Sequence, residues 1–246
     1  MNQQQSALTI AGSVLLGAII IAVAIITAGG GRYQALTIPA GAQPAATAQA
    51  AQQPVVDIKN VKISGEPSIG SATAPVTIAY WFDYQCPFCK QNEETVMPDI
   101  IKDYVDTGKV RIVYKDFPFL GPDSETLAIA ARAVWDAAPD KFYAWHKAMF
   151  DDQGRENSGW ATSAEIQKVT ESALGVPVAQ LVMQLMSTDK SKYETAISAD
   201  LSEGQSFGIT GTPSMIIGGP GGSKLDVGTY PYNAIQSDIN SALGSR

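Results

Sequence analysis

The distribution of apolar residues divides the chain into three segments. About 22 residues, Ala7 to Ala28, contain no charged side chain. The next segment, 29–56, consists mostly of Gly, Ala, Gln and Pro and has too few large apolar side chains to form a core. From Asp57 onward, short apolar runs alternate with helical periodicities, as is typical of a folded domain. The pattern predicts a hydrophobic helix over 7–28, a flexible linker over 29–56, and one folded domain.

The first segment is long enough to cross a membrane. As a helix it would span about 33 Å, more than the hydrocarbon core of a bilayer. A cleaved secretory signal is the alternative, but no Lys or Arg precedes the run, and no clear A-x-A site closes it. We therefore favour an uncleaved single-pass transmembrane anchor.

The folded domain begins with a strand, a helix and a second strand. Pro75–Phe82 and Val110–Phe117 are rich in β-branched and aromatic residues, which favours buried strands. The apolar positions between them have helical spacing, with a kink expected at Pro98 and an end at Gly108. A strand-helix-strand unit of this length predicts parallel pairing of the two strands.

Helical periodicity then continues to about residue 208 and predicts about five helices. The pattern changes again near the C-terminus. Two short strands, Ser214–Gly219 and Ser223–Gly228, flank a glycine-rich turn and predict a hairpin. An amphipathic helix over Tyr232–Leu243 closes the domain.

Composition excludes one class of partner. The chain is 45 % hydrophobic and 17 % charged, which is ordinary for a globular protein, and its net charge is −7. Nucleic-acid binding requires a basic surface. We therefore expect no nucleic-acid partner.

The chain has two cysteines, Cys86 and Cys89, in the stretch FDYQCPFCK. A structural zinc site needs four Cys or His ligands, and the only histidine, His146, lies far along the chain, so no metal is expected. A purely structural disulfide would close a very small loop and gain little stability. A redox pair remains as the third and favoured interpretation.

The position of the pair supports redox chemistry. Cys86 follows a predicted strand and opens a predicted helix, where the free N–H groups and the helix dipole stabilise a thiolate. Cys89 lies one turn later, where it can attack a mixed disulfide on Cys86. Pro87 fits the first helical turn, because the missing N–H is not needed there. Exchange of this kind needs no cofactor.

A second motif lies far along the chain. In GITGTPSMIIGG, Thr212 and Pro213 come directly before a predicted strand. Taken alone, this is a loop proline at the start of an edge strand. Together, APVTIAYWFDYQCPFC and GITGTPSMIIGG resemble the DsbA-like thiol–disulfide oxidoreductases of the thioredoxin superfamily, over about residues 57–246.

The resemblance implies an α/β thioredoxin fold with an inserted helical domain. The thioredoxin-like domain would comprise 57–120 and 209–246, and the insertion 121–208. It further implies that Cys86 is the nucleophile, Cys89 the resolving thiol and Pro213 a cis-proline. Thr212 would contact the pair and a peptide substrate.

Two positions depart from the best-known family members. Phe88 stands between the cysteines where they have histidine, and Tyr80 stands where they have an acidic residue. An exposed Phe88 would suit apolar, unfolded peptide substrates.

The expected activity is disulfide formation in exported, cysteine-containing proteins. A membrane redox partner of the DsbB or vitamin K epoxide reductase type would reoxidise the enzyme. The catalytic domain would then lie on the extracytoplasmic side of the cell membrane. A reductase or isomerase that uses the same pair as a dithiol is the alternative, and a tethered binding or chaperone module with an inert disulfide is another.

Four further features have two interpretations each. Asp83 is a proton acceptor for Cys89 or a turn residue, and Lys115 tunes the pair or ends a strand in solvent. His146 is expected to be structural rather than a general base. The acidic stretch Asp151–Asn157 is a solvated turn rather than a calcium site, because it lacks the spacing of an EF-hand loop.

Overall fold

Residues 56–244 are described by the computed structural model of the protein. The predicted anchor (7–28) and nearly all of the predicted linker (29–56) lie outside these residues. Within 56–244, none of the helices combines the length and the apolar character that spanning a membrane requires.

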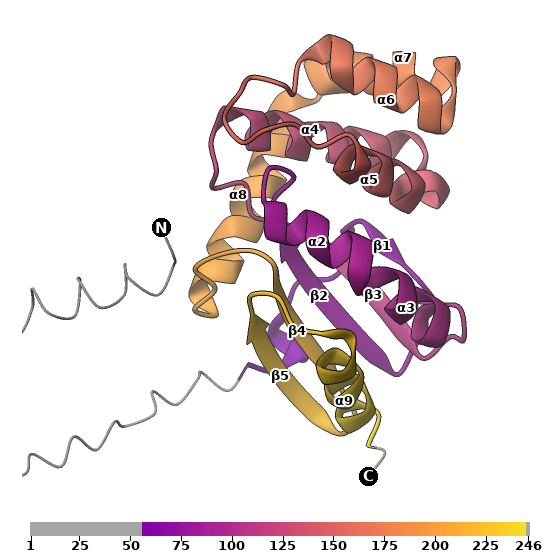
Figure 1. Ribbon diagram of the computed structural model, residues 1–246, viewed down its shortest axis with the longest axis vertical. Coiled ribbons are helices and arrows are strands. Elements are labelled where there is room, and N and C mark those ends of the chain that lie inside the picture. Colours follow the sequence, from indigo (N-terminus) through magenta and orange to yellow (C-terminus); the bar gives the residue numbers. More distant parts are fainter. Residues whose placement is uncertain (1–55, 245–246) are drawn as a thin grey trace, which may run out of the picture. The chain divides into compact units, whose positions relative to one another are not determined.

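The domain is built on a five-stranded mixed sheet in the order β1-β3-β2-β4-β5 (Figure 1). The strands are β1 (Ser68–Ile69), β2 (Val76–Phe82), β3 (Val110–Asp116), β4 (Ser214–Gly219) and β5 (Gly222–Val227). The central strands β2 and β3 are parallel, as predicted, and the other pairings are antiparallel. The two-residue strand β1 was not expected from the sequence.

Strand β2 is buried on both faces, because each face contributes to a different core. Ile78, Tyr80 and Phe82 point into the larger core, which also contains both cysteines. Ala79 and Trp81 point into a smaller core on the opposite face. This explains why the strand consists almost entirely of apolar residues.

Helices α2 (Pro87–Thr95), α3 (Met97–Ile100) and α9 (Tyr232–Ala242) cover one face of the sheet (Figure 1). The kink expected at Pro98 lies two residues earlier, at Val96, which has φ −120° and ψ −48°. Pro98 itself occupies the first turn of α3, where its missing N–H is harmless. The expected single helix is therefore two helices, followed by one π-helical turn, Ile101–Val105.

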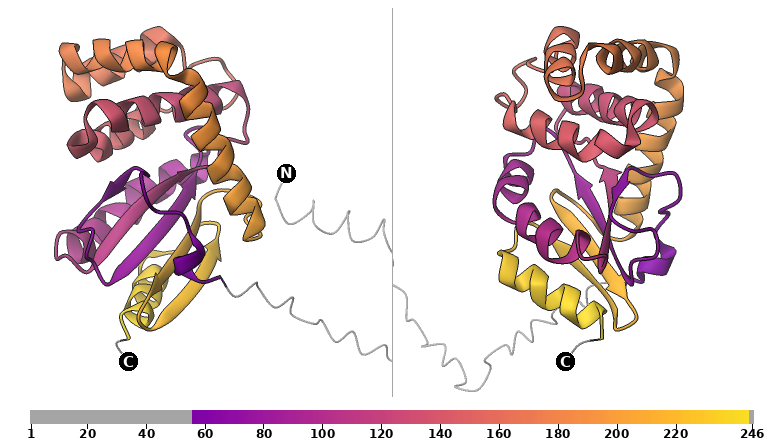
Figure 2. Two further views of the ribbon diagram at one scale, coloured as in Figure 1. Left: turned by 180° about the vertical axis from the view of Figure 1, so that it is seen from behind. Right: turned by 90° about the vertical axis from the view of Figure 1, so that its right-hand side faces the viewer.

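The insertion forms a helical layer beyond one end of the sheet (Figure 2). Its helices are α4 (Pro122–Ala137), α5 (Phe142–Asp151), α6 (Ser163–Leu174), α7 (Val176–Thr188) and α8 (Lys190–Ser206). Helix α8 returns the chain to the sheet and packs on Trp81. A Cβ atom at Gly204 would lie 2.9 Å from Trp81 Nε1, so this close approach requires glycine.

A buried cluster of charges joins β3 to α4 and α8. Lys115, which is completely buried, pairs with Asp200 at 2.5 Å and Glu203 at 3.0 Å. Its Nζ also donates to the carbonyl of Lys62. Lys115 follows Tyr114, whose side chain lies in the larger core, and points to the opposite face. It therefore neither tunes the cysteine pair nor ends a strand in solvent, so both interpretations were wrong.

Arg132 of α4 is the second cation of this cluster. Its guanidinium contacts three carboxylates: Asp116 at 2.6 Å, Glu66 at 2.5 Å, and Asp200. Burial, together with the neighbouring carboxylates, raises the pKa of Asp200 to about 7 despite the two cations. The cluster thus attaches the insertion to the sheet through buried cations and carboxylates that neutralise one another.

Replacing Arg132 with methionine should destabilise the protein by about 3–5 kcal/mol, because buried carboxylates would lose their cation. Denaturant unfolding measures the change. Lys192→Met is the control: Lys192 is 61 % exposed and pairs with Asp136 at the surface, so about 0–1 kcal/mol is expected. Equal stability of the two variants would contradict the assigned role of the cluster.

Candidate active site

The turn between β2 and α2 places Cys86 at the N-terminus of the helix. The Cys86 N–H donates to Asp83 O at 3.0 Å, which closes the turn. Cys86 is the N-cap residue, with φ −72° and ψ 117°, and Pro87 is the first helical residue. The Cys86 sulfur therefore lies near the free N–H groups of the first turn.

Asp83 stabilises this turn with its side chain. Its Oδ1 accepts hydrogen bonds from Gln85 N at 2.8 Å and Ser124 Oγ at 2.6 Å. Its Oδ2 accepts from the backbone N–H groups of Phe119 and Leu120. Burial nevertheless raises the pKa of Asp83, although these bonds oppose it. With four donors already bound, the carboxylate is a turn residue and not a free proton acceptor for Cys89.

The two cysteines are free thiols in contrasting environments. A hydrogen bond with Cys89, aided by Thr212 and by the N–H groups of Cys89 and Phe88, outweighs burial and lowers the pKa of Cys86 to about 6. Burial raises the pKa of Cys89, whose side chain is 0 % exposed, and the nearby charge of Cys86 adds to this. Cys86 is thus the thiolate and Cys89 the thiol of the reduced pair.

The loop before β4 lies against Cys86. The peptide bond between Thr212 and Pro213 is cis. When it is protonated, the Cys86 thiol donates a hydrogen bond to Thr212 O at 3.3 Å across 126 residues of sequence, whereas the Thr212 side chain favours the thiolate. The structure therefore brings together the two motifs that the sequence analysis singled out.

The insertion holds the active-site turn from the other side. Gln153 Nε2 donates to the carbonyls of Tyr84 at 2.7 Å and Cys86 at 3.1 Å. Asn157 N donates to Gln85 Oε1 at 2.7 Å. The sequence predicted a solvated turn over Asp151–Asn157. The stretch is more than that, because it packs on the active-site turn. Nothing local in the sequence around Gln153 indicates this role.

Several apolar residues beside the active-site turn are exposed. Phe88 is 58 % exposed, and Pro87 beside it is also exposed. Phe119, on the loop that Asp83 holds, is 48 % exposed. Exposed aromatic residues thus lie between the two buried cysteines in sequence and on the loop that the Asp83 side chain holds.

His146 lies inside the larger core. Its Nδ1 is 2.8 Å from Tyr84 Oη, and its Nε2 is 3.2 Å from Glu93 Oε1. Its ring packs edge-on against Phe82 and Phe150. It contacts buried aromatic residues rather than the surface, in keeping with the structural role expected for it. Glu93, which is 1 % exposed, was not singled out from the sequence.

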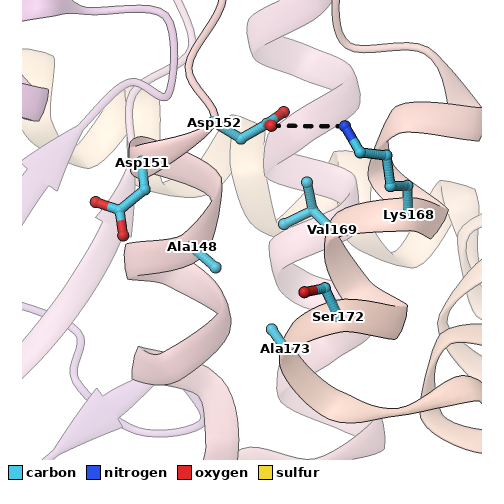
Figure 3. Close-up of a pocket in the computed structure, with 7 residues that line it drawn as sticks. All are labelled: Ala148, Asp151, Asp152, Lys168, Val169, Ser172 and Ala173. Atoms are coloured by element: carbon cyan, nitrogen blue, oxygen red, sulfur yellow. Dashed lines mark ion pairs between the residues drawn. The ribbon is translucent and has the colours of Figure 1, made fainter.

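A cavity of about 360 Å³ lies elsewhere, between α5 and α6 (Figure 3). Asp152 and Lys168 face each other across it at 3.9 Å. None of its lining residues is one of the predicted site residues. We therefore place the chemistry at the cysteine pair and not in this cavity.

Comparison with known proteins agrees with this placement. The family model described as thioredoxin matches residues 62–224, which includes both cysteines and the cis-proline.

The chain belongs to the thioredoxin family.

Relatives within the family narrow the assignment. Disulfide bond formation protein D of Bacillus subtilis is 30 % identical over 181 residues, covering 74 % of this chain and 78 % of that protein. The crystal structure of oxidised BdbD from Bacillus subtilis superposes with a TM-score of 0.66 at 28 % identity, over 75 % of this chain and 96 % of that one. The crystal structure of a periplasmic thioredoxin-like protein from Salmonella enterica serovar Typhimurium superposes with a TM-score of 0.59 at 26 % sequence identity, over 73 % of this chain and 91 % of that one. This member of the thioredoxin family is a DsbA-like thiol–disulfide oxidoreductase.

The lowered pKa of Cys86 predicts a thiolate at neutral pH. Ultraviolet absorbance of the reduced enzyme should show a thiolate transition with a midpoint near pH 6. Cys86→Ser should abolish the transition, whereas Cys89→Ala should raise its midpoint, because the largest stabilising hydrogen bond is lost. A wild-type midpoint above about pH 8, near the usual value for a free cysteine, would contradict the assignment.

The same shift predicts how the stability of the reduced enzyme depends on pH. Cys86 has a lower pKa in the folded state than in the unfolded state, where it is about 8.5. Its contribution is therefore complete above about pH 8.5 and is lost as the pH falls through about 6. Denaturant unfolding of the reduced enzyme measures this as the difference between wild type and Cys86→Ser, which lacks the Cys86 contribution but keeps that of other groups, such as Asp200.

Proposed function

We propose that this oxidoreductase forms disulfide bonds in exported proteins by exchange at Cys86 and Cys89. The observation that carries the proposal is the contrast between the two thiols, one with a pKa lowered to about 6 and one with a raised pKa. A sulfur that is stable as a thiolate is a good leaving group. Cys86 is therefore suited to passing a disulfide on to a substrate.

The proposed cycle has two steps. A substrate thiolate attacks Cys86 of the Cys86–Cys89 disulfide, the bond between the two cysteines breaks, and Cys89 takes up a proton. The second substrate thiolate then attacks the substrate sulfur of the mixed disulfide, and Cys86 leaves as a thiolate. The substrate is oxidised by two electrons and the enzyme pair is reduced by two.

The stabilised thiolate favours this direction. Hydrogen bonds to Cys86 stabilise the reduced enzyme, which makes its disulfide a stronger oxidant. A Cys86 pKa of about 6 lies between those of thioredoxin, about 7, and DsbA, about 3.5. The reduction potential should accordingly lie between those of the two proteins.

The test of the proposal is the reduction potential of the pair, measured in glutathione buffers. We expect a value between about −270 mV, the potential of thioredoxin, and about −120 mV, that of DsbA. A value at or below that of thioredoxin would favour the reductase alternative, with the dithiol as the working form. Cys86→Ala should abolish exchange, and retained activity would indicate a binding module instead.

We also propose that Pro87, Phe88, Thr212 and Pro213 form the surface that receives the substrate. Exposed Phe88 supports this role, since an aromatic ring can cover apolar segments of an unfolded chain.

Phe88→Ser should slow the oxidation of apolar dithiol peptides several-fold and leave the oxidation of dithiothreitol nearly unchanged. The rates of both reactions, measured side by side, test this. An equal effect on the two substrates would show that Phe88 acts on the pair and not on peptide binding.

The proposal extends to the anchor and the domain organisation. The uncharged run over 7–28 supports a single-pass anchor, joined by the linker 29–56 to a thioredoxin-like domain (57–120 and 209–246) that carries the insertion 121–208. Disulfide formation requires an oxidising compartment, which supports a location of the catalytic domain on the extracytoplasmic side of the membrane. A membrane redox partner of the DsbB or vitamin K epoxide reductase type would accept the electrons. Protection of the domain from protease added to spheroplasts would contradict this placement.

A further inference from the structure

The side-chain amide of Gln153 contacts the nucleophile's turn from the insertion. Its Nε2 carries two N–H groups and donates to two backbone carbonyls, that of Tyr84 at 2.7 Å and that of Cys86 at 3.1 Å. Gln153 lies in the loop after α5, 67 residues beyond Cys86 in sequence, and is half-buried. One amide thus binds both the residue that reacts and the turn that precedes it.

The bond from Gln153 to the Cys86 carbonyl is not needed to satisfy that oxygen. The oxygen already accepts from the N–H groups of Cys89 and Lys90, each at 3.1 Å, as the first acceptor of α2. A carbonyl oxygen has two lone pairs, and the helix uses both. The third donor instead places the positive end of an amide dipole beside the residue that carries negative charge in the reduced enzyme.

Other contacts fix the loop that carries Gln153. Asn157 N donates to Gln85 Oε1 at 2.7 Å, which ties the far end of the loop to the same turn. The loop also packs on Trp160: a Cβ atom at Gly154 would lie 2.5 Å from Trp160 Cγ, so a larger residue would push the loop away. The amide is therefore in place before the nucleophile becomes charged and does not have to reorganise.

The two redox states of the pair differ in the charge that lies beside this amide. When two electrons break the Cys86–Cys89 disulfide, Cys86 keeps its charge as a thiolate and Cys89 takes up a proton. The oxidised pair carries no charge. A dipole fixed beside Cys86 therefore stabilises the reduced enzyme more than the oxidised enzyme, which makes the disulfide a stronger oxidant.

We infer that Gln153 is a positioning residue of the exchange reaction: its amide holds the Tyr84 and Cys86 carbonyls, and through them the insertion stabilises the thiolate and raises the reduction potential of the pair. Gln153 acts through the backbone of the nucleophile and transfers neither a proton nor an electron. Because its side chain is uncharged, its effect does not depend on its own titration. The insertion is then part of the redox centre, since it supplies a donor that helix α2 does not.

The thiolate titration and the reduction potential test this inference on the full chain. Gln153→Met keeps the length of the side chain and removes both donors without changing any charge. We expect the midpoint of the Cys86 thiolate transition to rise by about one pH unit, as for the loss of one hydrogen bond to a charged group. At pH 8, where Cys86 is ionised in both enzymes, the disulfide should be an approximately tenfold weaker oxidant, which corresponds to about 30 mV.

These two measurements distinguish positioning from a purely structural role. If Gln153 only held the loop in place, its loss would destabilise the oxidised and the reduced enzyme equally, and neither the midpoint nor the potential would change. Denaturant unfolding of both forms measures the two stabilities. Gln167→Met is the matched control, because Gln167 is exposed on α6 of the same insertion and bonds to Glu171. This control should have the midpoint and the potential of wild type.

A wild-type midpoint and potential in folded Gln153→Met would overturn the inference. If that variant does not fold, Gln153→Asn provides the test: its amide is one methylene shorter and cannot reach both carbonyls, so the midpoint should rise by part of the same amount, and an unchanged midpoint would overturn the inference.

The inference rests on the proposed exchange at Cys86, and the two fail differently. A wild-type enzyme that does not exchange with glutathione would refute the function, whereas normal exchange that Gln153→Met leaves unchanged refutes only the role of Gln153.

Discussion

The function depends on one constraint, which is that a sulfur atom must carry negative charge inside a largely buried site. Burial opposes the charge on Cys86, and the hydrogen bonds of Cys89, Thr212 and the first helical turn outweigh it. The N-terminus of α2 supplies those N–H groups without further cost, because no preceding turn of helix uses them. The order of the elements follows from this: a strand must end where the helix begins, and the loop that carries the cis-proline must close over the junction.

Two clusters of buried polar residues keep this junction rigid, and the insertion contributes residues to both clusters. On one face of the sheet, Arg132 and Lys115 join α4 and β3 to carboxylates of the N-terminal segment and α8. On the other face, His146 of α5 contacts Tyr84 and Glu93, one on each side of the cysteine pair in sequence. The insertion is therefore part of the catalytic architecture as well as an addition to its surface.

Local patterns in the sequence predicted the central strands, the helical block, the hairpin and the pair, because each depends on neighbouring residues. Contacts between distant residues were not predictable in the same way. The position of Lys115 in the sequence suggests the solvent-exposed end of a strand. Only the folded chain brings it to Asp200, 85 positions away. Gln153 and Glu93 carry no local signal, since a glutamine after a helix and a glutamate within one are ordinary. The resemblance to DsbA-like proteins supplied the cis-proline, which spacing alone left as a loop residue.

The two hydrogen bonds from Gln153 have a consequence for the biosynthesis of the enzyme. They hold the backbone of the nucleophile from a segment 67 residues further along the chain. During synthesis, the cysteines emerge well before this support exists, and the Thr212 loop emerges later still. The thiolate that makes the pair reactive therefore reaches its final surroundings only in a completed chain. A chain that ends before Gln153 and Thr212 therefore lacks both of these contacts with the nucleophile.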